Sequence, residues 1–308
     1  MIRRTVPQKT ISKETKLSGV GLHTGEYVNI TFKPAPADTG LVFVREDIKG
    51  DNLINAHIKY ISNTDRGTNL DNGSFRIHTS EHVLAAITGL EIDNCYICLD
   101  GPEVPIMDGS SKFFINALEE AKIVEQNVLR EEFFPSESIT YECEDSGSKI
   151  SIIPDENYKV NTIVDYKTKV LGEQEASINH ISEFKKEISS ARTFSFLHEL
   201  ETLLENGLIK GGDLNNAIVY VDKPLAESNM DILKKAFNKD SISVKANGIL
   251  DNLDLHYPNE AARHKLLDVI GDLALIGMKI RGKVIAEKPG HSINAKFAEK
   301  VSEVIKSD

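Results

Sequence analysis

Apolar positions recur around the whole circumference of one stretch, residues 259–277 (NEAARHKLLDVIGDLALIG). Pro258 prevents a helix from continuing into it from upstream, and Asn259 is a favourable N-cap. Gly277 supplies a left-handed stop at the other end. A helix that is apolar nearly all round is a buried helix. The pattern therefore predicts one buried, central helix over these residues.

Three polar residues interrupt this apolar surface. His264, Asp268 and Asp272 stand four apart and so form one stripe along the helix. Buried carboxylates are costly unless a cation or several donors neutralise them. A histidine and a carboxylate at i and i+4 can reach one metal ion, and two histidines with one carboxylate are a common catalytic zinc set. The competing interpretation is an internal hydrogen-bond network, and the helix alone does not decide between the two.

A second helix carries the candidate for the missing ligand. Thr79 or Ser80 can cap a helix that ends at Gly89, with Glu81 and His82 in its first turn. SEHVLAAITGL, from residue 80, aligns without gaps with ARHKLLDVIGD, from residue 262, and places His82 on the histidine of the central helix. This weak internal repeat predicts two similar α/β halves that each present one histidine at their shared interface.

The other elements follow from shorter patterns. Alternating runs predict strands, and residues 148–154 and 158–166 are expected to pair with each other. Helices are expected over 112–123, over 197–207 and from about Asn294. Residues 124–134 are charged and irregular, so we place a domain boundary there, between domains 1–126 and 127–308.

Composition narrows the class of protein. With 308 residues, 40% of them hydrophobic and 27% charged, the chain is long enough for two globular domains. A net charge of -11 argues against a nucleic-acid surface but is compatible with a phosphate-bearing small molecule. The start lacks an apolar signal and no run approaches a membrane span, which predicts a cytoplasmic protein. Cys95 and Cys98 alternate within a predicted strand, which favours core positions over a metal or redox pair.

Together these residues form a candidate hydrolytic centre. His82, His264 and Asp268 are the candidate zinc ligands, and a fourth position stays open for water, whose pKa the metal lowers. Glu81 is the candidate general base. His291, in KPGHS, is the candidate acid for a leaving amine, with Asp272 keeping it protonated. On its own, His291 would be interpreted as a surface loop histidine.

At this point the chain resembles a known family, the UDP-3-O-acyl-N-acetylglucosamine deacetylases, zinc enzymes that commit a UDP-sugar to lipid A synthesis in Gram-negative bacteria. Seven motifs occur in order along nearly all of the chain: LSGVGLHTG, TSEHVLAAITGLEIDN, GPEVPIMDGS, ARTFSF, LIKGGDLNNAIV, NEAARHKLLDVIGDLALIG and KPGHSINAKF. The resemblance implies the same ligands, base, acid and acid partner as those inferred above.

Further roles are implied by the resemblance alone. It assigns Thr193 to the oxyanion, Phe194 to the nucleotide, and Lys265 and Lys288 to the diphosphate. Without the family, Thr193 is interpreted as a cap for the next helix. Lys265, at the start of the central helix, lies where both the helix dipole and its own ammonium favour an anion.

The resemblance also implies an architecture. It implies an α+β fold of two similar α/β sandwich domains packed face to face, with the active site between them. An insert in the second domain, assigned to residues 208–221, would form a hydrophobic passage for the acyl chain. The chain is most similar to Bacteroidetes-type sequences, which are often fused to a hydroxyacyl carrier-protein dehydratase. Since the sequence stops at Asp308, that second activity is expected to be absent or to have been trimmed from the full-length protein.

Two rival interpretations stay open. One is a catalytically silent nucleotide-sugar or metal-binding protein, against which the presence of Glu81 argues, because a structural zinc site needs no such residue. The other is a different amidohydrolase on the same scaffold. The acyl-chain length, the metal loaded in the cell, the oligomeric state and the role of residues 168–182 cannot be predicted from the sequence.

Overall fold

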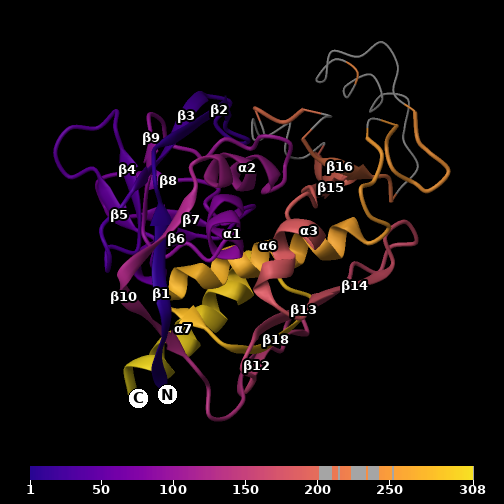
Figure 1. The fold of residues 1–308 in the computed structure, drawn as a ribbon. Helices are drawn as coiled ribbons and strands as arrows, with labels where there is room; N and C mark the ends of the chain where they lie inside the picture. The colour runs from indigo at the N-terminus through magenta and orange to yellow at the C-terminus, as the bar shows by residue number, and fades with distance from the viewer. Residues whose placement is uncertain (201–209, 214–215, 223–233, 235–242, 252, 308) are drawn as a thin grey trace.

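Two five-stranded sheets and a central pair of helices form the framework of the chain (Figure 1). The computed structural model describes all residues except 201–209, 214–215, 223–233, 235–242, 252 and 308. The first sheet has the order β2 (Thr15–Val20), β3 (Tyr27–Pro34), β9 (Cys95–Leu99), β4 (Leu41–Arg45) and β5 (Leu53–Asn55). The second has the order β11 (Ile139–Cys143), β12 (Ser148–Ile153), β18 (Gly282–Glu287), β13 (Tyr158–Asp165) and β14 (Glu173–Ile178).

The two sheets have the same topology. In the first sheet the middle strand β9 is antiparallel to β3 and parallel to β4. In the second sheet the middle strand β18 is antiparallel to β12 and parallel to β13. In each, that middle strand lies between two helices in sequence: α1 (Glu81–Gly89) and α2 (Lys112–Glu120), or α6 (Glu260–Leu273) and α7 (His291–Ser307). We call residues 15–120 the first unit and residues 139–307 the second unit. This correspondence confirms the expected α+β fold of two similar sheet-plus-helix units.

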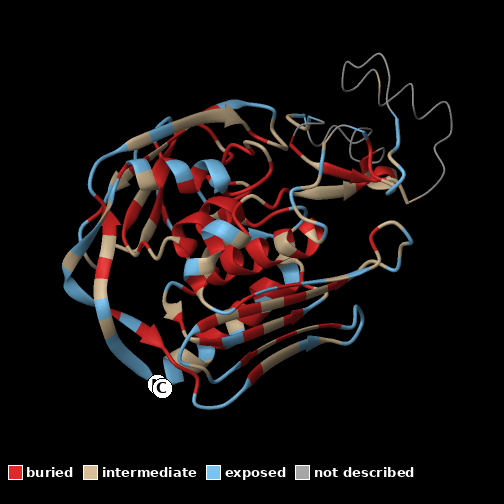
Figure 2. Cartoon of the chain, turned by 45° about the vertical axis from the view of Figure 1, so that its right-hand side comes forward, coloured by how far each residue is buried: buried red, intermediate tan, exposed pale blue. Residues whose placement is uncertain are grey.

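The central helices α1 and α6 pack against each other between the sheets, and Figure 2 shows both coloured almost entirely as buried. Every residue of α1 is buried, as are twelve positions of α6. α6 begins after Asn259 and continues into the 3-10 turn η3 (Ala274–Ile276), which Gly277 ends with a φ of 79°. The helix predicted over 259–277 is therefore confirmed.

Three sequence-based expectations were wrong. The strands β12 and β13 do not pair with each other, because β18 lies between them and pairs with both. Residues 124–134 are not irregular: most belong to β10 (Ile123–Phe133), which pairs antiparallel with β1 (Ile2–Ile11) through register shifts and buries the charged side chains of Arg130 and Glu132. The last helix begins at His291, three residues earlier than Asn294, so this histidine does not lie in a surface loop.

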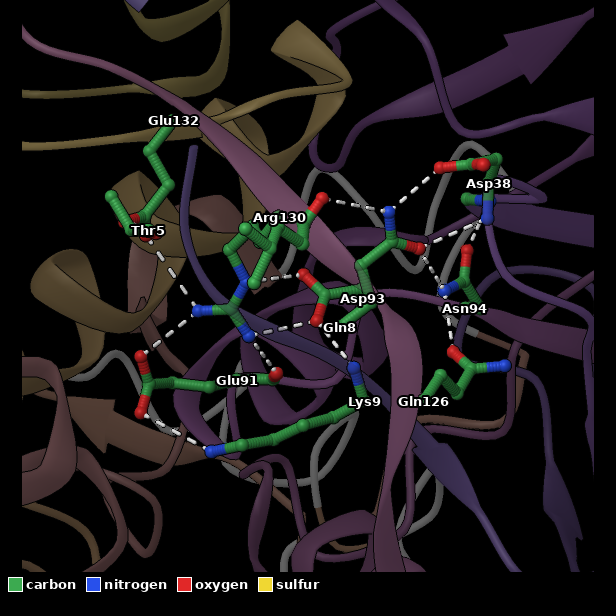
Figure 3. Close-up of polar contacts among 12 residues, drawn as sticks. Thr5, Gln8, Lys9, Asp38, Glu91, Asp93, Asn94, Gln126, Arg130 and Glu132 are labelled. Carbon is green, nitrogen blue, oxygen red and sulfur yellow. Dashed lines mark hydrogen bonds and ion pairs between the residues drawn. The ribbon is translucent and has the colours of Figure 1, made fainter. Parts of the chain in front are cut away.

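A buried polar network anchors the C-terminal end of α1 against β1 and β10 (Figure 3). The guanidinium of Arg130, on β10, donates to the carbonyl of Glu91 at 2.6 Å and to the carboxylate of Asp93 at 2.8 Å. Nearby, the amide of Asn94 donates to Gln8 at 2.8 Å and to Gln126 at 2.8 Å. Because these bonds fix the end of α1 that lies away from its histidine, they hold the helix in its position along α6.

The remaining described elements are short. They are β6 (Ile61–Asn63), β7 (Asn69–Asp71), β8 (Arg76–Ile77), β15 (Phe194–Phe196), β16 (Ile218–Tyr220), β17 (Lys279–Ile280), α3 (Phe184–Glu187), η1 (Ile58–Tyr60) and η2 (Ile181–Glu183). The helix expected over 197–207 is seen at residues 197–200, and the rest of it lies outside the described residues. Residues 168–182 include the edge strand β14. Among the described residues, no helix combines the length and apolarity that crossing a membrane requires.

The two cysteines of β9 are core residues. Cys95 and Cys98 are buried and form no disulfide. Burial raises the pKa of the Cys95 thiol to about 12 and that of the Cys98 thiol to about 11. Both thiols are therefore protonated and unreactive at neutral pH, in agreement with the predicted core positions.

Candidate active site

A close backbone contact between α1 and α6 brings the site together. A Cβ added to Gly271 would lie 2.1 Å from the carbonyl oxygen of Glu81, so the helices touch at a point where only glycine fits. Gly271 lies one turn after Asp268 on α6, and Glu81 is the first residue of α1. This contact places the first turn of α1 beside the polar stripe of α6.

The three predicted ligands meet there. His82, His264 and Asp268 are buried, and their ligand atoms lie within 4.8 Å of one another. The Oδ1 atom of Asp268 lies 3.7 Å from Nε2 of His82 and 3.4 Å from Nε2 of His264. This oxygen has no hydrogen-bond partner anywhere in the described part of the chain. A buried carboxylate oxygen facing two imidazole nitrogens without bonding to them fits a site for a divalent ion.

The surroundings keep these ligands in the protonation states that bind metal. Burial, with the nearby His264, lowers the pKa of His82 to about 3. Burial also lowers the pKa of His264, whose Nδ1 lies 3.1 Å from the carbonyl of Ala191, which leaves Nε2 facing the site. Burial raises the pKa of Asp268, but Lys265 and the histidines outweigh it, and the net pKa is below its ordinary value. Two neutral imidazoles and one carboxylate result.

Glu81 is held beside the ligands by the turn before β7. Its Oε2 accepts a hydrogen bond from the backbone N–H of Thr68 at 3.0 Å. Burial raises the pKa of the Glu81 carboxyl to about 7, against the opposing charge of His291 and with further increases from Asp272 and Asp268. A carboxyl that titrates near neutrality is suited to general base catalysis.

His291 is oriented by Asp272, as the stripe on α6 predicts. Its Nδ1 lies 2.9 Å from Oδ2 of Asp272, and its Nε2 lies 3.9 Å from Oε1 of Glu81. Asp272 also accepts hydrogen bonds from the Thr68 hydroxyl at 2.5 Å and the Asn294 amide at 2.8 Å. Burial lowers the pKa of His291, but the charge and hydrogen bond of Asp272 outweigh it and raise the pKa to about 9.

A cavity of about 270 Å³ opens onto these groups. Eight of the ten predicted site residues line it: Glu81, His82, Thr193, Phe194, His264, Lys265, Asp268 and His291. Asp272 lies behind His291. Lys288 does not line the cavity, and its ammonium lies 3.8 Å from Asp165.

The second unit also contributes Thr193, Phe194 and Lys265 to the cavity lining. Thr193 directly precedes β15, so the alternative that it caps a helix was wrong. Its backbone N–H donates to the carbonyl of Gly109 at 2.8 Å, which ties it to the first unit. The ammonium of Lys265 lies 2.8 Å from Oδ2 of Asp268 and 5.6 Å from the ring centre of Phe194.

Sequence reasoning missed several residues of the site. Thr68 contacts both Glu81 and Asp272, and Arg66, Tyr166 and Glu199 line the cavity. Thr68 and Arg66 lie in the short polar stretch TDRGT, which carries no recognisable motif. The one available signal is the position of this polar stretch just before the strand pair that leads into α1.

Comparison with known proteins assigns the chain to one group. The family model for UDP-3-O-acyl N-acetylglycosamine deacetylase matches residues 8–231 and 226–303. The chain is 43% identical over 299 residues to the "Bifunctional enzyme LpxC/FabZ" of Chlorobaculum tepidum, covering 96% of this chain and 64% of that protein. The same-named protein of Bacteroides thetaiotaomicron is 41% identical, with 97% and 65% covered.

A shorter relative is covered more fully. The "UDP-3-O-acyl-N-acetylglucosamine deacetylase" of Myxococcus xanthus is 37% identical over 295 residues, covering 96% of this chain and 86% of that protein. The chain thus spans less than two thirds of the length of the bifunctional relatives but most of the length of this one.

Proposed function

The chain belongs to the UDP-3-O-acyl-N-acetylglycosamine deacetylase family, and from that membership we propose that it hydrolyses the N-acetyl group of UDP-3-O-(3-hydroxyacyl)-N-acetylglucosamine. The products are acetate and the free amine, and the reaction is the committed step of lipid A biosynthesis in Gram-negative bacteria. The observation that carries the proposal is the convergence of His82, His264 and Asp268 on one point, with Glu81 beside them.

The proposed cofactor is Zn²⁺. Two imidazoles and one carboxylate with an open side match a catalytic zinc site, and the unsatisfied Oδ1 of Asp268 supports the fit. When bound, the ion would supply Lewis acidity that polarises an amide carbonyl and acidifies water. His82, His264 and Asp268 would hold it.

The residues of the chain supply the proton transfers. Glu81 takes a proton from the attacking water as the bond from oxygen to the acetyl carbon forms, since its pKa of about 7 leaves much of it ionised at neutral pH. The hydroxyl of Thr193 donates to the oxyanion that develops. As the C–N bond breaks, His291 gives its Nε2 proton to the leaving amine, and Asp272 holds the imidazole in place through Nδ1.

The substrate contacts are proposed from the cavity lining and the family. Phe194 and Lys265 lie in the cavity wall, where a ring face and an ammonium suit a nucleotide and its diphosphate. Lys288 is assigned to the diphosphate on the resemblance alone. Four further points stay predictions: the domain limits 1–126 and 127–308, the passage formed by residues 208–221, the cytoplasmic location and the fused dehydratase. Part of the segment 208–221 lies outside the described residues.

The experiment is acetate release from the UDP-linked substrate by zinc-loaded protein. Glu81→Gln should lower the rate by roughly 10²- to 10⁴-fold, since it removes the base, while zinc content stays near one per chain. Glu120→Gln, at an exposed position of α2, is the control and should leave the rate unchanged. A silent binding protein would release no acetate in any form, and equal rates for wild type and Glu81→Gln would remove the mechanism.

A further inference from the structure

The turn that carries Arg66 is held directly against the proposed base. Arg66 has a φ of 62°, in the left-handed region, and is followed by Gly67. A Cβ on Gly67 would lie 3.0 Å from Oε1 of Glu81, and the N–H of Thr68 donates to the same carboxylate. The position of Arg66 is therefore set by the site, and this strained turn points to a role there.

Arg66 forms an ion pair across the cavity. Its Nη1 lies 3.0 Å from Oε2 of Glu199. Arg66 comes from the first unit and Glu199 from the second, and both line the cavity that holds the ligands. In the part of the chain that the structure describes, the Nε and Nη2 donors of Arg66 have no partner. Its side chain is 44% exposed, so the pair lies at the open side of the cavity.

Arg66 carries a positive charge at every physiological pH, and its ion pair can be exchanged for one with a ligand. The other permanent cation in the described lining, Lys265, is 17% exposed and bonded to the buried Asp268 at 2.8 Å. This bond holds Lys265 beside Asp268, so Lys265 can face an anion in the cavity only from that fixed position. Breaking an exposed pair such as that of Arg66 and Glu199 costs little. The planar guanidinium also presents parallel donors that match phosphate oxygens.

We propose that Arg66 is a substrate-binding residue that leaves Glu199 and binds the diphosphate of the nucleotide, so that its ion pair with Glu199 spans the cavity only in the free enzyme. The inference rests on the proposed function, because that function supplies the nucleoside diphosphate. Glu199 acts as a competitor for Arg66. The two residues therefore have opposite effects on affinity, whereas two residues that merely stabilise the fold would both weaken binding when changed.

The test is calorimetric titration of the zinc-loaded full chain with UDP, and with uridine as the ligand that lacks phosphate. Arg66→Gln should weaken UDP binding by roughly tenfold, as expected for loss of a charge-assisted contact. Glu199→Gln should tighten UDP binding by up to about fivefold, because the competing ion pair is gone. Uridine affinity should not change in either variant. With substrate, Arg66→Gln should raise KM while kcat changes little.

The exposed pair of Arg3 and Glu156 provides a matched control, since its separation is 3.2 Å and Arg3 is also 44% exposed. Arg3→Gln and Glu156→Gln should leave UDP affinity unchanged. Weakened binding in both Arg66→Gln and Glu199→Gln, or an equal change for uridine, would overturn the proposal. UDP binding is measured without turnover. Failure to release acetate would therefore count against the proposed function alone, whereas the UDP titrations test the role of Arg66.

Discussion

A methyl group at Gly271 perturbs the contact on which the whole site depends. In Gly271→Ala the new Cβ would lie 2.1 Å from the carbonyl oxygen of Glu81, whereas ordinary contact begins at 3.4 Å, so α1 and α6 must part by about 1.3 Å (3.4 − 2.1). Overpacking of this kind costs about 1–3 kcal/mol, and the better helix propensity of alanine returns about 1 kcal/mol of that. The net change in the free energy of unfolding is thus modest.

The effect on the site should be much larger. Glu81 and His82 belong to α1, so a shift of about 1 Å moves them away from α6. This displacement should lower the rate roughly 10²-fold. Zinc affinity, measured by competition with a chromophoric chelator, should fall as well. Gly290→Ala is the stability control, because no heavy atom lies within 4 Å of its added Cβ. A Gly271→Ala protein that is more stable than wild type and keeps its zinc affinity would refute this packing argument.

Three further outcomes are expected. A plot of kcat/KM against pH should be bell-shaped, rising as Glu81 ionises near 7 and falling as His291 deprotonates near 9, and a bound dication should move both limbs to lower pH. Arg130→Met should lower the free energy of unfolding, measured with urea, by about 3 kcal/mol, because it removes the cation nearest to Asp93 and one of the cations near the buried Glu132. The exposed Arg4→Met should change it by less than about 0.5 kcal/mol. Removing a metal present at 100 times its Kd should lower Tm by about 4 °C, measured by calorimetry with and without chelator.

The elements with strong periodicity and clear ends could be predicted from the sequence. The central helix lies between Pro258 and Gly277, which mark its ends. The internal repeat places His82 at the position equivalent to His264, and from this the sequence predicts that the two histidines lie together. That meeting is seen, with His82 and His264 ring centres 5.0 Å apart. The repeat also corresponds to sheets of identical topology, which eleven aligned residues only suggested.

The parts that could not be predicted depend on partners far away in sequence. The hairpin-like spacing of β12 and β13 favours direct pairing, but β18, from near the C-terminus, lies between them. β10 appears irregular because it pairs with β1 through bulges, which breaks the regular alternation. Thr68 could not be assigned because its contact with Asp272, 204 residues away, forms only when the two units pack, and nothing in the sequence links it to Glu81.

The most direct test of the central claim is anomalous diffraction at the zinc edge from crystals of the metal-loaded protein. We expect one strong peak per chain, about 2.0–2.2 Å from Nε2 of His82, Nε2 of His264 and a carboxylate oxygen of Asp268. A peak at any other place, or a crystal grown with zinc that shows no peak between these three side chains, would contradict the account.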